Sequence, residues 1–226
     1  MKKDIEDRLE KIVEVSTRKA AIDEWRSASE KQKVPLYNYR YDHIKEVVDL
    51  AKFIASGTDA NPDVIMLASW LHDLAKPGIG GISAEQHGIA SAELAEEILP
   101  QEDVDFELIA QVSDVIKKHV GLTIKEPLQP IEAQILWEAD KILKLGIIGL
   151  LQYTLNGVRI FPGQSLMEIS ERMHEFLPLA EDIAGCVVTE KGKTIAKERL
   201  QRLYLLLELL DSELNPSKKY GRTGNR

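Results

Sequence analysis

The chain has 226 residues, of which 44% are hydrophobic and 29% charged, as is ordinary for a globular protein. Its formal net charge of -8 argues against broad binding to nucleic acid, which normally needs a basic face. The single cysteine excludes an internal disulfide, and no stretch reaches the roughly 20 apolar residues of a membrane span. Because residues 1–10 are too charged for an export signal, we expect a cytoplasmic protein that does not enter the membrane.

Helical periodicity runs through the whole chain, and no segment alternates as a strand would. The first of these helices is charged and amphipathic and ends before Pro35, and proline and glycine residues mark several later boundaries. The further expected helices are 41–57, 62–76, 83–99, 104–119, 131–155, 165–183 and 189–214, with a turn-rich connector over 156–164.

These elements predict an all-α fold, a helical bundle with an additional C-terminal helical lobe. Residues 1–36 are expected to form an amphipathic helix that packs on the core, and residues 37–155 the core itself. Residues 156–214 supply the C-terminal helices, and residues 215–226 a flexible tail. The leucines between positions 203 and 214 form an ordinary core stripe, or they could serve a homodimer interface.

Five predicted helices each place ionisable residues among the apolar residues of one face. His43, for example, lies four and eleven residues before Val47 and Ile54. The residues concerned are His43, His72, Asp73, His87, His119 and Asp140. A single buried group of this kind is normally satisfied by a hydrogen bond within the core. A shared divalent cation accounts for all of them together, because imidazole and carboxylate groups are its usual ligands.

Three segments around these residues resemble the HD superfamily of metal-dependent phosphohydrolases. Tyr39–Val48 (Tyr-Arg-Tyr-Asp-His-Ile-Lys-Glu-Val-Val) is similar to the opening helix with its first histidine. Leu71–Pro77 contains the His-Asp doublet that names the superfamily, and Glu138–Ile142 (Glu-Ala-Asp-Lys-Ile) is similar to the closing helix with its last aspartate. The resemblance covers residues 37–150 and implies an HD-domain fold with a metal-binding core.

The resemblance also implies a ligand set. One metal ion would be bound by a first group of residues: His43, His72, Asp73 and Asp140. Some members of the superfamily hold two ions bridged by the doublet aspartate, and here His87 and His119 match the ligands of the second ion. Those two histidines could instead contact the substrate. Mixed nitrogen and oxygen ligands suit Mn, Fe, Co, Ni or Zn, and one or two ions remain open.

The implied reaction is hydrolysis of a phosphate ester of a small metabolite, with a nucleotide as the favoured substrate. A metal-activated water would be the nucleophile, oriented by Asp73. Arg40 and Lys76 lie one turn from the histidine ligands and are candidate catalytic and phosphate-binding residues, and Arg159 is a further candidate for binding substrate. The alternative for each of these cations is an ordinary solvated surface charge.

Two other functions remain open at this point. The same six-residue pattern also supports a non-haem di-iron oxygenase, which redox-active iron and oxygen consumption would reveal. The chain could also be a non-catalytic nucleotide-binding HD module. For each of these functions the expected partner is a small molecule, which for a phosphohydrolase is a phosphorylated substrate. Neither nucleic acid nor a membrane is expected as a partner.

Overall fold

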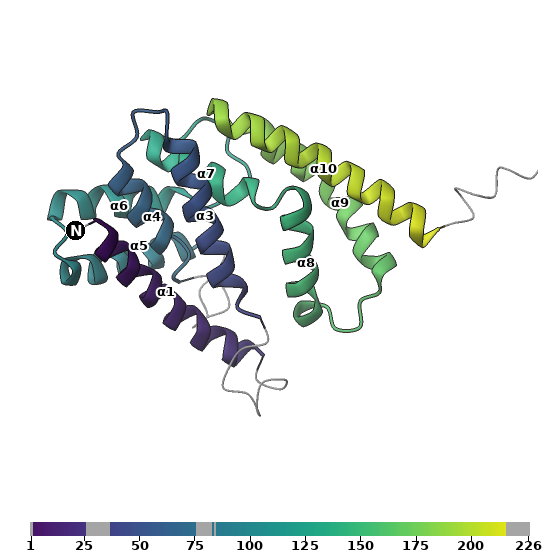
Figure 1. The fold of residues 1–226 in the computed structure, drawn as a ribbon, viewed down its shortest axis with the longest axis horizontal. Coiled ribbons are helices and arrows are strands. Elements are labelled where there is room, and N and C mark those ends of the chain that lie inside the picture. The colour runs from purple at the N-terminus through teal and green to yellow at the C-terminus, as the bar shows by residue number, and fades with distance from the viewer. Residues whose placement is uncertain (1, 26–36, 76–82, 84, 216–226) are drawn as a thin grey trace, which may run out of the picture. The chain divides into compact units, whose positions relative to one another are not determined.

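The computed structural model describes residues 2–25, 37–75, 83 and 85–215. Over these residues the chain forms nine α-helices and a short 3-10 helix, without a strand, which confirms the predicted all-α fold (Figure 1). The chain divides into two compact units, residues 1–141 and 142–226. The expected tail beyond residue 215 lies outside the described residues. Within them, no helix is long and apolar enough to span a bilayer.

The first unit is built around a short buried helix, α4. Every residue of α4 from Val64 to Leu71 is buried. Helices α3 and α6 pack on α4, α5 packs on α6, and α1 lies against both α3 and α4. The elements of this unit are α1 (Lys2–Glu24), α3 (Tyr39–Ala55), α4 (Pro62–Leu71), α5 (His87–Ile98), η1 (Leu99–Glu102), α6 (Phe106–Lys118) and α7 (Ile131–Ile142).

The ends of α4 are set by local residues. The Asn61 side chain accepts a hydrogen bond from the backbone N–H of Asp63, and Pro62 occupies the first turn, where its missing N–H has no cost. We expected this helix to run to residue 76, but it ends at Leu71 and residues 72–75 form a turn. This early end brings His72 and Asp73 into the turn that directly follows the buried helix.

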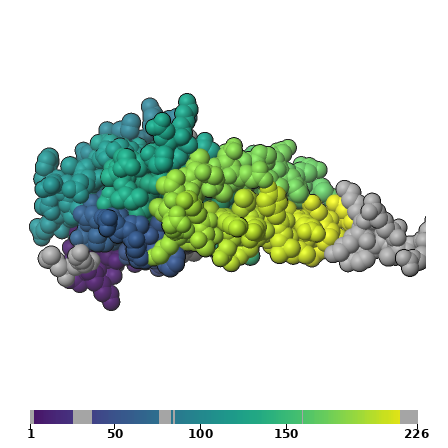
Figure 2. Space-filling view, turned by 90° about the horizontal axis from the view of Figure 1, so that it is seen from above, coloured from purple at the N-terminus to yellow at the C-terminus, as the bar shows by residue number. Residues whose placement is uncertain are grey.

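The second unit contains α8 (Gly146–Ile160), α9 (Leu166–Gly185) and α10 (Glu190–Leu214). Helix α10 packs along α9, as the adjoining green and yellow side chains show (Figure 2), and also on α8. A capping box at Ser165 and Glu168 begins α9, and Thr189 caps α10. Leu203 and Leu207 of the leucine stripe are buried in this unit.

The prediction of one long helix over residues 131–155 was wrong, because α7 ends at Ile142 and a separate helix, α8, begins at Gly146. Gly146 has a φ of 73°, a backbone conformation that residues with a side chain rarely adopt. A Cβ atom at Gly149 would lie 2.1 Å from the carbonyl oxygen of Lys144, so only glycine fits there. Helix α8 then continues to Ile160, into the segment where we expected a connector.

Candidate metal centre

The six ionisable residues singled out in the sequence come together in the first unit. His43 lies on α3 and Asp140 on α7. His72 and Asp73 follow α4, His87 begins α5, and His119 follows α6. Five of the six are at most 3% exposed, and the side chain of His87 is 12% exposed. His87 is therefore the member of the cluster that is most open to solvent.

Asp73 lies between two pairs of histidines. Its Oδ2 atom is 3.6 Å from Nε2 of both His43 and His72. Its Oδ1 atom is 3.4 Å from Nε2 of His87 and 3.6 Å from Nε2 of His119. Two atoms that bind one ion at about 2.1 Å are themselves roughly 3–3.5 Å apart. Each carboxylate oxygen of Asp73 is therefore placed to share one ion with one histidine pair.

Asp140 adds a second carboxylate to the cluster. Its Oδ1 atom lies 3.1 Å from Nε2 of His43. Asp140, His72 and His119 also offer ligand atoms that all lie within 4.8 Å of one another. The same limit is met by His43 with His72 and Asp73, and by Asp73 with His87 and His119. The cluster is thus consistent with a metal site, and its geometry fits two ions as well as one.

Backbone contacts fix the tautomers of two histidine rings. Nδ1–H of His72 donates to the carbonyl oxygen of Ser69 at 2.8 Å, and Nδ1–H of His119 donates to that of Ile116 at 2.6 Å. Because a carbonyl can only accept, each Nδ1 carries the proton, and in the neutral ring Nε2 presents its lone pair to the cluster. The Nε2 atoms of His87 and His119 are 3.0 Å apart, a separation that suits two ligands of one ion.

The environment of His72 favours a neutral ring. Burial lowers the pKa of His72 from 6.5 to about 3, because the charged imidazolium would lose its hydration. Its Nε2 atom is buried and has no hydrogen-bond partner in the protein. A buried polar atom without a partner is costly. A neutral imidazole with an unsatisfied inward nitrogen is the form that binds a metal ion, so the donor set fits the expected group.

Of the three cationic side chains proposed for phosphate binding, the structure describes one. Arg40 is buried, at 6% exposure, and its guanidinium donates to Oε1 of Glu24 at 2.7 Å. It therefore joins α3 to α1, and a phosphate would have to compete with an existing ion pair. Lys76 lies outside the described residues, as does the side chain of Arg159. Their roles stay predictions.

Two contacts of the cluster were not foreseen from the sequence. The ammonium group of Lys141, itself buried, contacts Oδ2 of Asp140. The ring of Tyr39 stacks on that of His43, with centroids 5.6 Å apart and planes 15° apart. Neighbouring residues on a helix do not normally face each other, so spacing gives no signal for the first contact. Tyr39 precedes His43 by one helical turn, and this spacing could have indicated the second.

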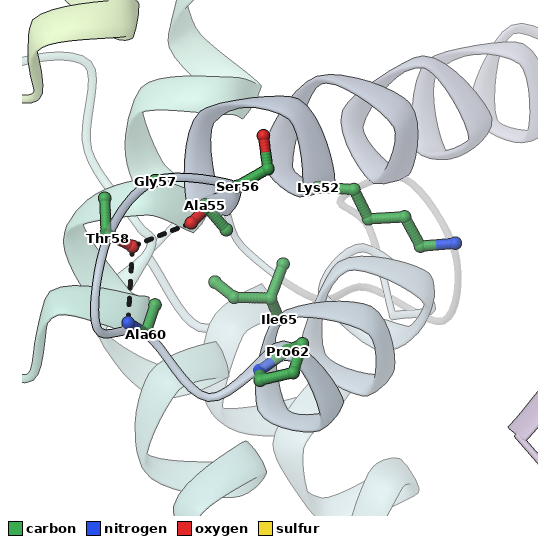
Figure 3. A pocket seen from close by; sticks show the side chains of 8 residues that line it. All are labelled: Lys52, Ala55, Ser56, Gly57, Thr58, Ala60, Pro62 and Ile65. Atoms are coloured by element: carbon green, nitrogen blue, oxygen red, sulfur yellow. Dashed lines mark hydrogen bonds between the residues drawn. The ribbon is translucent and has the colours of Figure 1, made fainter.

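A surface pocket of about 370 Å³ lies elsewhere in the first unit (Figure 3). It is lined by residues around the end of α3 and the start of α4, among them Lys52, Thr58 and Ile65. Lys52 follows His43 by nine positions on α3, which is about 14 Å along the helix. None of the lining residues is a histidine or carboxylate, so this pocket is distinct from the candidate metal centre.

Residues 40–145 match the HD domain family. This part of the chain, which contains all six residues of the cluster, is therefore an HD domain, as the sequence motifs predicted.

Solved structures share the fold over nearly the whole chain. Bacillus subtilis YpgQ, solved in complex with ADP, has a TM-score of 0.63 at 17% identity, covering 92% of this chain and 97% of YpgQ. An HD-superfamily hydrolase from Bacillus thuringiensis has a TM-score of 0.63 at 18% identity, covering 95% of this chain and 99% of that one. At these identities the likeness concerns the fold.

A curated relative is the tRNA (cytidine(56)-2'-O)-methyltransferase of Thermoplasma volcanium. It is 26% identical over an alignment of 153 residues, and the match covers 62% of this chain. The matched region spans only 42% of the methyltransferase. Less than half of that enzyme therefore has a counterpart here.

Proposed function

We propose that the protein is a metal-dependent phosphohydrolase that cleaves a phosphate ester of a small metabolite, with a nucleotide as its substrate. The observation that carries this proposal is the position of Asp73, which directs one oxygen to each of two histidine pairs. The HD domain supports the reaction class, and a structural relative is described as an HD-superfamily hydrolase. The ADP complex of YpgQ supports a nucleotide.

The described residues divide into two ligand groups around Asp73. One ion would be held by His43, His72, Asp140 and Oδ2 of Asp73, and a second by His87, His119 and Oδ1 of Asp73. When bound, such ions lower the pKa of a coordinated water towards about 7 and offset negative charge on phosphoryl oxygens.

The protein groups have separate tasks in this proposal. Asp73 holds the two halves of the site together and orients the attacking water. The carbonyls of Ser69 and Ile116 keep the rings of His72 and His119 in the ligating tautomer. Deep burial of the other ligands excludes bulk water, while the partial exposure of His87 marks the side from which a substrate can approach.

Elemental analysis of the purified chain tests the metal. We expect up to two equivalents of transition metal, lost in a His72→Ala/Asp73→Ala double variant. His174→Ala is the matched control, because this histidine lies on α9 and pairs with Asp211, outside the cluster. If neither the native protein nor one reconstituted with Mn, Co, Ni, Fe or Zn holds metal, the metal centre and the enzyme assignment are both wrong.

Phosphate release from a panel of nucleotides and simple phosphate esters tests the reaction. We expect hydrolysis by the metal-loaded chain and none by the double variant. Redox-active iron together with oxygen uptake, and no phosphate release, would instead assign an oxygenase. Tight nucleotide binding with neither reaction would assign a binding module.

A further inference from the structure

Lys141 is a buried cation beside a candidate metal ligand. It follows Asp140 on α7, its side chain is 5% exposed, and its ammonium group contacts Oδ2 of Asp140. Consecutive helical residues project in different directions, so the long lysine side chain must fold back to reach this oxygen. Burial of an ammonium group is costly unless a counter-charge lies close by, and Asp140 supplies one.

The two oxygens of Asp140 have different neighbours. Oδ1 lies 3.1 Å from Nε2 of His43, within the ligand cluster. Oδ2 is engaged by Lys141. With one oxygen held from outside the cluster, the carboxylate cannot rotate freely, and it offers a single oxygen to the site.

We propose that Lys141 is a positioning residue that fixes Asp140 as a one-oxygen ligand. This inference rests on the metal centre of the proposed function and adds a residue to it. Hydrogen bonds to ligating groups commonly set the orientation of the ligand, and their loss weakens metal affinity about 10–100-fold. Lys141 acts through Asp140 and has no contact with the reacting atoms.

A competing electrostatic effect has the opposite sign. A lysine ammonium repels a metal cation and withdraws charge from the carboxylate that it contacts. If this repulsion dominated, removal of Lys141 would tighten metal binding. If the lysine only filled space in the core, its removal would change the unfolding temperature of the metal-free protein and leave metal affinity as it was. The direction of the change in affinity therefore separates the three roles.

The experiment is a titration of the metal-free full-length chain with Mn²⁺, using a competing chelator to measure Kd. We expect Lys141→Met to raise Kd at one site about 10–100-fold. Lys117→Met is the charge-matched control, because Lys117 is exposed on α6 and pairs with Glu96. The control should leave Kd unchanged. An unchanged or lower Kd in Lys141→Met would overturn the proposal.

A double-mutant cycle tests whether Lys141 acts through Asp140. Asp140→Ala will itself weaken binding, and adding Lys141→Met to it should have little further effect. An equal loss in both backgrounds would show that the lysine acts independently of the aspartate, against the proposal.

Lys141→Gln is a second variant, for the case that Lys141→Met does not fold. Its side chain keeps an N–H donor, so we expect a Kd between those of the wild type and Lys141→Met, with the helical circular dichroism signal intact. If Lys141→Met does not fold, a folded Lys141→Gln that binds Mn²⁺ more tightly than the wild type contradicts the positioning role. Because no arm measures hydrolysis, a chain that binds Mn²⁺ as expected but cleaves no phosphate ester would refute the proposed function alone.

Discussion

The two oxygens of Asp73 contact different histidine pairs, so they should be separable by substitution. Asp73→Asn keeps the size of the side chain but replaces one oxygen by an NH2 group, which cannot bind a cation. If the native chain binds two equivalents of metal, we expect this variant to bind one. Elemental analysis against the His174→Ala control checks this, and retention of two equivalents would contradict the bridging role.

His72 should make the metal-free protein sensitive to acid. Its pKa is about 3 in the folded state because of burial, and near 6.5 when unfolded. As the pH falls from 6.5 towards 3, the unfolded chain takes up a proton that the folded chain does not. The free energy of unfolding should therefore fall, by up to about 1.4 kcal/mol per pH unit from this residue.

Urea unfolding of the metal-free protein between pH 7 and 4 measures this slope. His72→Gln removes the titrating ring, so its pH dependence should be shallower than that of the wild type. Equal slopes in the two proteins would mean that burial of His72 is not linked to acid sensitivity.

At the scale of elements, α1 is joined to α3 by the Arg40–Glu24 ion pair. The side chains are 7% and 17% exposed, so removal of Glu24 leaves a poorly solvated guanidinium. We expect Glu24→Gln to destabilise the fold by about 1.5–3 kcal/mol in chemical unfolding. Glu198→Gln removes an exposed pair with Arg202 on α10 and should cost less than about 1 kcal/mol. Similar losses in both variants would argue against a special role for the buried pair.

The contact between α5 and α6 depends on a small residue beside His87. A Cβ atom at Gly88 would lie 2.5 Å from Cγ2 of Val120 and 3.3 Å from the carbonyl oxygen of Ile116. Gly88→Ala should push the helices apart and lengthen the 3.0 Å separation of His87 and His119. We therefore expect weaker Mn²⁺ binding at the second ion site with the first retained.

Gly185→Ala is the matched control for this substitution, because no atom lies within 4 Å of the added Cβ. It should leave Mn²⁺ binding unchanged and alter stability only slightly. Equal Mn²⁺ affinities in the Gly88 and Gly185 variants would show that the helix contact does not control the ligand distance.

On the scale of the whole molecule, all six candidate ligands lie in the unit that spans residues 1–141. A ligand at 100 times its Kd stabilises the state that binds it by about 2.7 kcal/mol. Metal should therefore slow hydrogen exchange in α3, α4 and α6, and a chelator should reverse the effect. Peptides from α9 and α10 are the internal reference. If metal slowed hydrogen exchange equally in both units, its stabilising effect would not be confined to the first unit, against this prediction.

Much of the fold could be predicted from the sequence, because helical periodicity and the spacing of polar residues are local features. The His-Asp doublet could be recognised for that reason, as could the inward faces of the helices that bear the other histidines. The break before Gly146 could not be foreseen, since it depends on a backbone angle and on the close approach of Lys144. The contacts of Arg40 with Glu24 and of Lys141 with Asp140 could not be predicted either, because they depend on side-chain conformations in the folded structure.

His72 and His119 each stand directly after the last residue of a helix, α4 and α6. The peptide dipoles of a helix add up to a partial negative charge at this end, which favours a nearby cation. Two such ends converge on one cluster, so the backbone itself makes the site attractive to positive ions before any carboxylate is counted. A chain without the Asp73 charge should therefore keep some preference for cations over anions.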